Sequence, residues 1–344
     1  MSERTNVRGQ GRCLVIAEGG SNHGGSLDRA LEMTRVAAEC GAHAIKWQKR
    51  ENHTLYAKSF YKSPYTSEHA YGPTYGEHRE ALEFGMEEFR ELKTYAQTLG
   101  LTFLSTAFDI PSVNFLRELD CCSIKVASGS VTDTPLIEHI RDSGARIILS
   151  TGGFHLTEVS RAVEAAGDAL TALLHCTAEY PASDDHLNLN CIRTYKDLWP
   201  RLSIGASLHG YGVLPGVMAY SAGAEVLEVH FTLDRTAKGT DNAFSLEPDG
   251  LKTLCRYLAR AEQMMGDGVK RVYEQEQGPI LKMAKSLRAA STLRSGSLLE
   301  RRDILIQSPA VEGSLPPYHL NEILGRKLTR DLEEEEPIFL DDIA

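Results

Sequence analysis

The sequence contains no apolar run of 18 or more residues and no run of basic side chains. A helix that spans a bilayer needs about 20 consecutive apolar residues, so we predict that the chain does not enter a membrane. The 47 acidic residues outnumber the 37 Lys and Arg, which gives a formal net charge of −10 at pH 7. Because proteins that bind nucleic acids present basic surfaces, we expect no nucleic acid among its partners.

Cysteine is present, but not in a pattern that would build a disulfide framework or a zinc site. Of the seven cysteines only Cys121 and Cys122 are adjacent, and the sequence has no Cys-x-x-Cys motif. The first twelve residues, MSERTNVRGQGR, are charged and lack the apolar centre of a secretory signal. We therefore predict a cytoplasmic protein whose thiols remain reduced.

Short apolar segments alternate with stretches of helical length over most of the chain. The eight apolar segments are Leu14–Glu18, Ala42–Gln48, Leu101–Phe108, Ser123–Ser128, Arg146–Thr151, Ala172–Thr177, Leu202–His209 and Val226–Leu233. Strands that alternate with helices form parallel sheets, and eight such units predict a closed (β/α)8 TIM barrel of the α/β class. An open doubly wound sheet is disfavoured, because Gly19–Gly25 does not fit the GxGxxG phosphate turn.

The character of the chain changes towards its C-terminus. We predict a barrel domain over residues 1–270, a polar linker over 271–282 and a small, mostly β domain over 283–344. The last domain contains the β-like pieces Leu287–Thr292 and Ile304–Gln307, separated by Gly and Pro turns. A domain of this size has a marginal core, so we expect it to pack against a barrel.

Polar residues stand at the C-terminal end of every predicted strand. They are Glu18, Lys46 with Gln48, Ser105 with Thr106, Lys125 with Ser128, Ser150 with Thr151, Thr177, Ser207 with His209, and Glu228 with His230. This edge of a (β/α)8 barrel carries the active site. A single strand can end in a serine by chance, but all eight ends together indicate a functional rim.

Two imidazoles at this rim suggest a metal site. His209 ends the seventh predicted strand, and His230 lies near the end of the eighth. Glu228 is two residues from His230, so both side chains point to the same face of their strand. Such histidines can bind a divalent cation. The alternative is a pair of core histidines that hydrogen-bond to the backbone.

The two lysines at the rim give the predicted site a positive charge. Lys46 and Lys125 end strands that are buried on both faces, where an unpaired ammonium group is costly. Each lysine therefore needs an anion, either a bound phosphate or a neighbouring carboxylate such as Glu18 or Glu228. Nearby serine and threonine hydroxyls could also donate hydrogen bonds to phosphate oxygens.

The long segment Arg50–Glu83 separates the second and third predicted strands and is rich in tyrosine and histidine. Long insertions after a barrel strand commonly form lids or substrate-binding loops. The aromatic residues favour an ordered structure. The alternative is a surface loop with stacked tyrosines.

Several motifs occur in order along the chain: IAEGGSNHGG, AIKWQ, LSTAFD, SIKVASGS, LHCTAEYP and LEVHFTLD. From about Val15 to Ile343 the chain resembles the sialic acid synthase family, which condenses phosphoenolpyruvate with N-acetylmannosamine or its 6-phosphate. Its last part, from AKSLRAASTL onward, resembles that family's SAF (antifreeze-like) domain. The segment PYTSEHAYGPTYGEHREALEF is similar to the animal-type enzymes, which use the phosphorylated sugar.

The resemblance implies a metal-dependent enzyme that releases phosphate and makes a 2-keto-3-deoxy sugar acid. His209 and His230 match the ligands of Mn²⁺ or Mg²⁺. The positions that hold phosphoenolpyruvate are matched by Lys46, Thr106, Lys125, Ser128, Ser150 and Ser207. Positions near the sugar or the metal-bound water are matched by Glu18, Gln48, Tyr180, Glu228 and Asp241. Lys46, Lys125, Glu18 and Glu228 are the expected catalytic residues, with Glu228 handling the proton of water. The family forms a homodimer in which each SAF domain covers the partner's barrel mouth.

The sequence departs from the family pattern at several places. Ser130 stands where the family has an acid, and Ala178 replaces a residue that is expected to contact phosphate. The other departures are Leu208, Val229, Asn242 and Gln307, the last replacing part of a basic motif. Most of these lie on the sugar side, so we predict an altered aldose specificity. An aldolase with another donor and a non-catalytic sugar-binding homologue are the alternatives.

Overall fold

The structure is a computed structural model that describes residues 13–344. The N-terminal segment that was analysed for a secretion signal lies outside the described residues. The chain divides into two units, Met1–Gly266 and Asp267–Ala344. Within the described part, no helix is both long and apolar enough to cross a membrane.

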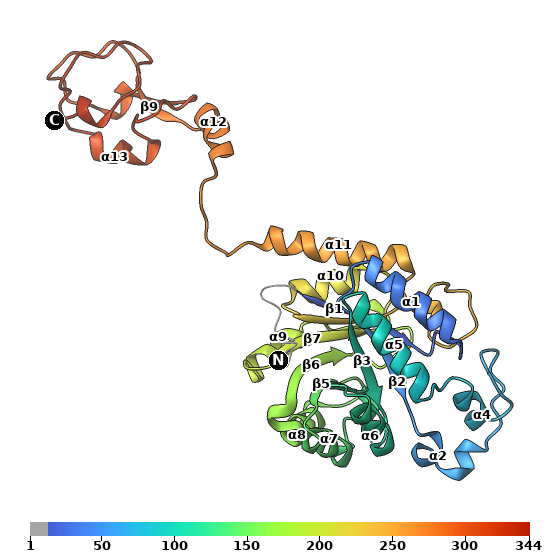
Figure 1. Ribbon diagram of the computed structural model, residues 1–344. Helices are drawn as coiled ribbons and strands as arrows, with labels where there is room; N and C mark the ends of the chain where they lie inside the picture. Colours follow the sequence, from blue (N-terminus) through green and yellow to red (C-terminus); the bar gives the residue numbers. More distant parts are fainter. Residues whose placement is uncertain (1–12) are drawn as a thin grey trace. The chain divides into compact units, whose positions relative to one another are not determined.

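The first unit is a closed barrel of eight parallel strands arranged in chain order (Figure 1). The strands are β1 Leu14–Gly20, β2 Ala44–Lys49, β3 Thr102–Ala107, β4 Ser123–Val126, β5 Arg146–Ser150, β6 Leu170–Cys176, β7 Ser203–Leu208 and β8 Val226–His230. The predicted (β/α)8 barrel is therefore confirmed, and each predicted segment overlaps one strand. The largest difference is at β8, which ends at His230 rather than at Leu233.

Helices cover the outside of the barrel (Figure 1). They are α1 Leu27–Glu39, α5 Met86–Thr98, α6 Ile110–Glu118, α7 Thr134–Asp142, α8 Leu156–Ala166, α9 Cys191–Leu198, α10 Leu214–Ser221 and α11 Pro248–Met265. Local sequence determines where several of these helices begin. The side chains of Ser26, Asp109 and Asp133 accept hydrogen bonds from backbone N–H groups in the first turns of α1, α6 and α7. Such caps satisfy donors that have no partner within the helix.

Apolar side chains fill the barrel interior beneath the polar rim. This inner cluster consists of Ile16, Ala44, Leu104, Ile148, Ala172, Leu174 and Val226. Ile16 precedes Glu18 by two residues, and Val226 precedes Glu228 by two. Because side chains alternate along a strand, both members of each pair face the barrel axis in successive layers. The polar layer therefore lies directly on an apolar plug.

The segment between β2 and β3 is ordered and has its own aromatic core. It contains the short helices α2 Asn52–Leu55, α3 Lys58–Tyr61 and α4 Tyr75–Glu80. The ring centroid of Tyr75 lies 4.5 Å from Phe60, 5.0 Å from Tyr56 and 5.5 Å from Tyr65. Aromatic contacts at these distances stabilise the segment without help from a sheet.

The second unit begins with α12 Glu274–Met283, which occupies most of the predicted linker 271–282. The sequence did not reveal this helix because Gly278 and Pro279, which are typical of turns, stand inside it, and none of its residues is buried. An antiparallel pair follows, β9 Ser286–Ala289 with β10 Ile304–Gln307, and then α13 Leu320–Ile323. β9 ends at Ala289, short of the predicted Thr292.

Gly205 is the tightest position in the barrel wall. A Cβ there would lie 2.1 Å from the carbonyl oxygen of Val226 and 2.7 Å from Leu174 Cδ2. We predict that Gly205→Ala lowers the free energy of unfolding by about 1–3 kcal/mol or more, because β7 and β8 must move apart. Urea unfolding measures this change. Gly129→Ala, where no atom lies within 4 Å of the added Cβ, is the control. Equal stability of the two variants would contradict the prediction.

Candidate active site

Strand register brings the polar rim together. Glu18 of β1 pairs with Lys46 of β2 on one side and with His230 of β8 on the other. Thr106 of β3 pairs with Lys125 of β4. Because neighbouring strands are in register at these residues, their side chains converge at the carboxyl end of the barrel.

These side chains line one cavity of about 480 Å³. All of the site residues predicted from the sequence contribute to it: Glu18, Lys46, Gln48, Thr106, Lys125, Ser128, Ser150, Tyr180, Ser207, His209, Glu228, His230 and Asp241. Of the polar residues named at the strand ends, Ser105, Thr151 and Thr177 do not line it. The chemical role of each residue remains a prediction.

Two lysines and two glutamates form a buried charge cluster at the cavity floor. Lys46 Nζ lies 2.6 Å from Glu18 Oε2 and 3.4 Å from Glu228 Oε1. Lys125 Nζ lies 4.0 Å from Glu228 Oε2. Both lysines are only 2% exposed. The rim carboxylates thus do pair with the lysines, as one of the two sequence-based alternatives held, but the two lysines are not equally well paired.

The difference between the lysines shows in their electrostatics. Burial lowers the pKa of Lys125, and the more distant Glu228 compensates only in part. For Lys46, burial also acts to lower the pKa, but Glu18 and Glu228 together outweigh it and raise the pKa. Burial alone would raise the pKa of Glu228, yet Lys125 and Lys46 hold it at about 2. Glu228 is therefore ionised at neutral pH, and Lys125 is the buried cation that gains most from a bound anion.

Hydroxyl groups surround this floor. Thr106 Oγ1 accepts a hydrogen bond from Lys46 Nζ at 3.0 Å, and Ser207 Oγ donates to Glu228 Oε1 at 3.1 Å. Ser128 Oγ accepts from the backbone N–H of Gly152 at 2.9 Å. The buried hydroxyl of Ser150 has no hydrogen-bond partner within residues 13–344. A buried hydroxyl without a partner is costly, and a ligand oxygen would satisfy it.

The two histidines lie side by side, with ring centroids 5.2 Å apart. His209 Nδ1 lies 2.8 Å from the carbonyl oxygen of Thr177, so Nδ1 carries the proton and Nε2 keeps a lone pair. His230 Nδ1 is buried without a hydrogen-bond partner in the described part of the chain, and Asp241 Oδ2 lies 3.8 Å away. Burial lowers the pKa of His230, which keeps the ring neutral. Two imidazoles that each have a ring nitrogen free of hydrogen bonds within residues 13–344 fit a divalent cation.

The cavity also contains two arginines that the sequence analysis did not single out. Arg50 donates to Gln48 Oε1 at 2.6 Å and stacks over the ring of Phe108 at 3.9 Å. Arg79 of α4 donates through Nε and Nη2 to the hydroxyl of Tyr75. Arg50 follows Gln48 by two residues, so its direction could have been inferred from strand alternation. Arg79 gave no such signal, because the inserted segment has no periodic pattern that relates it to the barrel.

None of the five departures from the family pattern in the barrel unit lines the cavity: Ser130, Ala178, Leu208, Val229 and Asn242. Leu208 and Val229 are buried in the apolar layer between the strands and the outer helices. Alternation along β7 and β8 places them opposite to Ser207 and Glu228. These two side chains do not contact the cavity directly, and the altered aldose specificity stays a prediction. Ser130 is buried as well.

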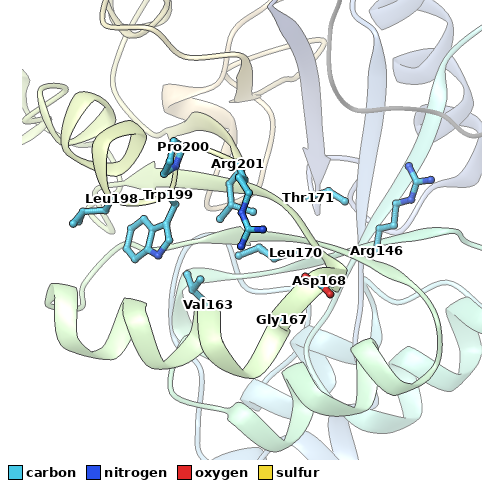
Figure 2. Close-up of a pocket in the computed structure, with 11 residues that line it drawn as sticks. Arg146, Val163, Gly167, Asp168, Leu170, Thr171, Leu198, Trp199, Pro200 and Arg201 are labelled. Carbon is cyan, nitrogen blue, oxygen red and sulfur yellow. The ribbon is translucent and has the colours of Figure 1, made fainter.

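A second cavity, of about 610 Å³, lies at the opposite end of the barrel (Figure 2). Arg146, Leu170 and Leu202, which line it, stand at or just before the N-terminal ends of β5, β6 and β7. Trp199 and Arg201 complete much of its wall (Figure 2). The N-terminal face of such barrels serves stability rather than catalysis, so we assign the active site to the carboxyl end.

A closed barrel whose strand ends gather paired lysines, glutamates and histidines in one cavity has the architecture of a (β/α)8 enzyme. Residues 33–270 match the NeuB family, and residues 284–344 match the SAF domain. The chain belongs to the NeuB family, as the sequence motifs predicted.

Relatives with established names cover nearly the whole chain. Human N-acetylneuraminate-9-phosphate synthase is 35% identical over 97% of this chain and 93% of its own length. N,N'-diacetyllegionaminic acid synthase of Campylobacter jejuni is 34% identical over 95% of this chain and 99% of its own. The solved N-acetylneuraminic acid (sialic acid) synthetase of Leptospira borgpetersenii, in complex with citrate, has a TM-score of 0.69 at 32% identity. That match covers 78% of this chain and 90% of the other.

Removing Lys46 should expose the cost of the buried charges. In Lys46→Met, Glu18 and Glu228 face each other with only Lys125 nearby, so we predict a loss of about 3–5 kcal/mol in the free energy of unfolding. Adding Glu18→Gln should restore part of that loss, because one buried carboxylate is removed. Urea unfolding of the single and double variants measures both effects. Arg35→Met, which breaks an exposed pair with Glu32, is the control and should change little. A Lys46→Met protein as stable as the wild type would contradict the prediction that Lys46 compensates the two buried carboxylates.

Proposed function

We propose that the protein condenses phosphoenolpyruvate with an aldose, either an N-acetylmannosamine-like sugar or its 6-phosphate. The products are a sialic-acid-like 2-keto-3-deoxy sugar acid and inorganic phosphate. The observation that carries this proposal is the buried cluster of Lys46, Lys125, Glu18 and Glu228, ringed by hydroxyls, at the floor of the barrel cavity. Similarity to named synthases of sialic and legionaminic acids supports it.

Phosphoenolpyruvate carries a phosphate and a carboxylate, and the cavity floor suits both. Lys125 is the less well compensated cation, so an anionic oxygen beside it relieves a buried charge. Charge-assisted hydrogen bonds from both lysines would hold the donor. Neutral hydroxyls would complete its binding site: Thr106, Ser128, Ser150 and Ser207.

The reaction needs one carbon–carbon bond and one water. C3 of phosphoenolpyruvate attacks the aldehyde carbon, and the aldehyde oxygen takes up a proton. C2 then develops cationic character and water adds to it. Glu228, which is ionised at neutral pH, accepts a proton from that water. The resulting tetrahedral intermediate collapses to the 2-keto acid as the C2–O bond to phosphate breaks. Lys46 and Lys125 stabilise the departing phosphate.

We propose that His209 and His230 hold Mn²⁺ or Mg²⁺. The support is the unpartnered Nδ1 of His230 beside a second imidazole whose tautomer leaves Nε2 available. A bound divalent ion supplies Lewis acidity that polarises and orients an aldehyde. No third His, Cys, Asp or Glu joins them as a metal-binding group in residues 13–344, so water or substrate would complete the coordination.

The acceptor would lie above the donor, against Gln48, Tyr180 and Asp241. Arg50 and Arg79 add positive charge to this side of the cavity. Arg79 forms no ion pair with a carboxylate among the described residues, which favours an acceptor that carries a phosphate.

We also propose a cytoplasmic homodimer in which the SAF domain of one subunit covers the barrel mouth of its partner. Apolar side chains support this arrangement, because Tyr180, Tyr211 and Leu214 follow β6 and β7 and are each more than half exposed. Exposed apolar groups near an active site commonly mark a surface that another domain covers.

Phosphate release tests the reaction. With phosphoenolpyruvate and Mn²⁺, we predict that inorganic phosphate appears only when a suitable aldose or aldose phosphate is present, and that EDTA abolishes it. Donor labelled with ¹⁸O at the C2–O–P bridge should give labelled phosphate, because the C–O bond breaks. Condensation without phosphate release would indicate an aldolase with another donor. If the folded protein releases no phosphate with any of a broad set of aldoses and aldose phosphates, a non-catalytic sugar-binding homologue would be favoured.

Arg79 should report whether the acceptor is phosphorylated. We predict that Arg79→Gln raises the KM for an aldose phosphate by about tenfold to a hundredfold, because a charge-assisted hydrogen bond is lost. The KM for phosphoenolpyruvate and the KM for the free aldose should stay within a small factor. Steady-state kinetics with both forms of one sugar decide the matter. An equal rise for the free sugar would show that Arg79 does not bind the phosphate.

A further inference from the structure

Three loops at the barrel mouth meet at the side chain of Tyr71. The Tyr71 hydroxyl donates a 2.7 Å hydrogen bond to the carbonyl oxygen of Lys238, and Lys238 Nζ lies 4.7 Å from the centre of the Tyr71 ring. The backbone N–H of Gly239 donates to His69 Nδ1 at 3.3 Å. The segment after β2 is thereby fastened to the segment after β8, about 170 residues further along the chain.

The loop after β1 reaches the same point. A Cβ at Gly24 would lie 2.9 Å from the Tyr71 hydroxyl oxygen, so the backbone there packs directly against this group. Gly24 also has a φ of +60°, a conformation that glycine adopts without strain. Tyr71 thus bridges the loops that follow β1 and β8.

Both ends of this bridge carry residues of the cavity. Lys238 and Gly239 directly precede Thr240 and Asp241, which line the cavity. On the other side, the backbone N–H of Tyr71 donates to His78 Nδ1 at 3.1 Å, and His78 is the neighbour of Arg79. The Tyr71 hydroxyl therefore holds the segment that leads to Asp241, while the backbone N–H of Tyr71 contacts the helix that carries Arg79.

The carbonyl oxygen of Lys238 also accepts a hydrogen bond from Asn242 Nδ2 at 3.1 Å, a contact within the same loop. Together with the hydrogen bond from Gly239 to His69, Tyr71 links this loop to the inserted segment, which has its own aromatic core. The tyrosine side chain has few rotatable bonds, so fixing it against the β8 loop costs little conformational entropy.

We propose that Tyr71 is a positioning residue for the acceptor subsite, which it holds open in one geometry by tying the Asp241 loop to the Arg79 helix. The proposal rests on the function proposed above. It separates the acceptor from the donor, because no contact of Tyr71 reaches Lys46 or Lys125.

Tyr71→Phe removes the hydroxyl and keeps the ring. We expect the KM for the acceptor to rise about fivefold, as the loss of one hydrogen bond to a backbone carbonyl predicts, with the KM for phosphoenolpyruvate within twofold. Tyr65→Phe is the matched control, because the Tyr65 hydroxyl forms no hydrogen bond in the described part of the chain and its ring belongs to the same cluster. An unchanged acceptor KM, or an equal rise for both substrates, would overturn the proposal.

A double-mutant cycle tests the contact with Gly24. Gly24→Ala should raise the acceptor KM, and Tyr71→Phe should relieve part of that effect by making room for the new methyl group. Backbone strain from the positive φ is the same in both backgrounds and cancels in the cycle. Strictly additive effects would show that the hydroxyl and Gly24 are not in contact.

Amide hydrogen exchange tests whether Tyr71 holds the β8 loop in place. It needs no substrate, so its result is independent of the proposed reaction. Peptides that cover residues 236–246 should exchange faster in Tyr71→Phe than in the wild type or in Tyr65→Phe. Exchange that is the same in all three proteins would overturn the positioning role even if the enzyme is active. Faster exchange, with no reaction from any aldose, would leave Tyr71 as the tie of this loop and refute only the synthase assignment.

Discussion

The constraint that shapes this protein is the burial of two ammonium groups and two carboxylates inside the barrel. Taking each ion out of water costs several kcal/mol, and only close, well-oriented pairing offsets that cost. Parallel strands in register provide the pairing, since Glu18 and Lys46 stand opposite each other on β1 and β2. The apolar plug beneath keeps water out and strengthens every charge interaction above it.

The two buried lysines are not equally well compensated by the carboxylates. Lys46 lies between two carboxylates, whereas Lys125 has one partner at 4.0 Å. A cation that is poorly compensated destabilises the empty protein and binds an anion more strongly when one arrives. The same arrangement keeps Glu228 ionised, so the group assigned to accept a proton is in the correct state before the reaction begins.

The floor and the wall of the cavity come from different parts of the fold. Strand ends build the floor, where the charges and hydroxyls lie, while the loops after β1, β2 and β8 contribute the wall, on which we propose that the acceptor binds. Of the departures from the family pattern, Leu208 and Val229 pack against the outer helices and therefore leave the surface of the cavity unchanged. Loops tolerate changes of sequence because they do not carry the barrel's hydrogen-bond ladder.

The sequence by itself determined the barrel and the floor of the site. Short apolar segments alternating with helices specify a parallel barrel, and polar residues at strand ends must then converge, because side-chain alternation and register leave them no other place. Glu18, Lys46, Lys125 and Glu228 were predictable for that reason. Only the tertiary structure decided how the lysines share their carboxylates, and that Arg79 and Tyr71 reach the mouth of the barrel. Those contacts join segments that are far apart in the chain, such as Tyr71 and Lys238, and the local sequence pattern of one segment does not predict its contacts with the other.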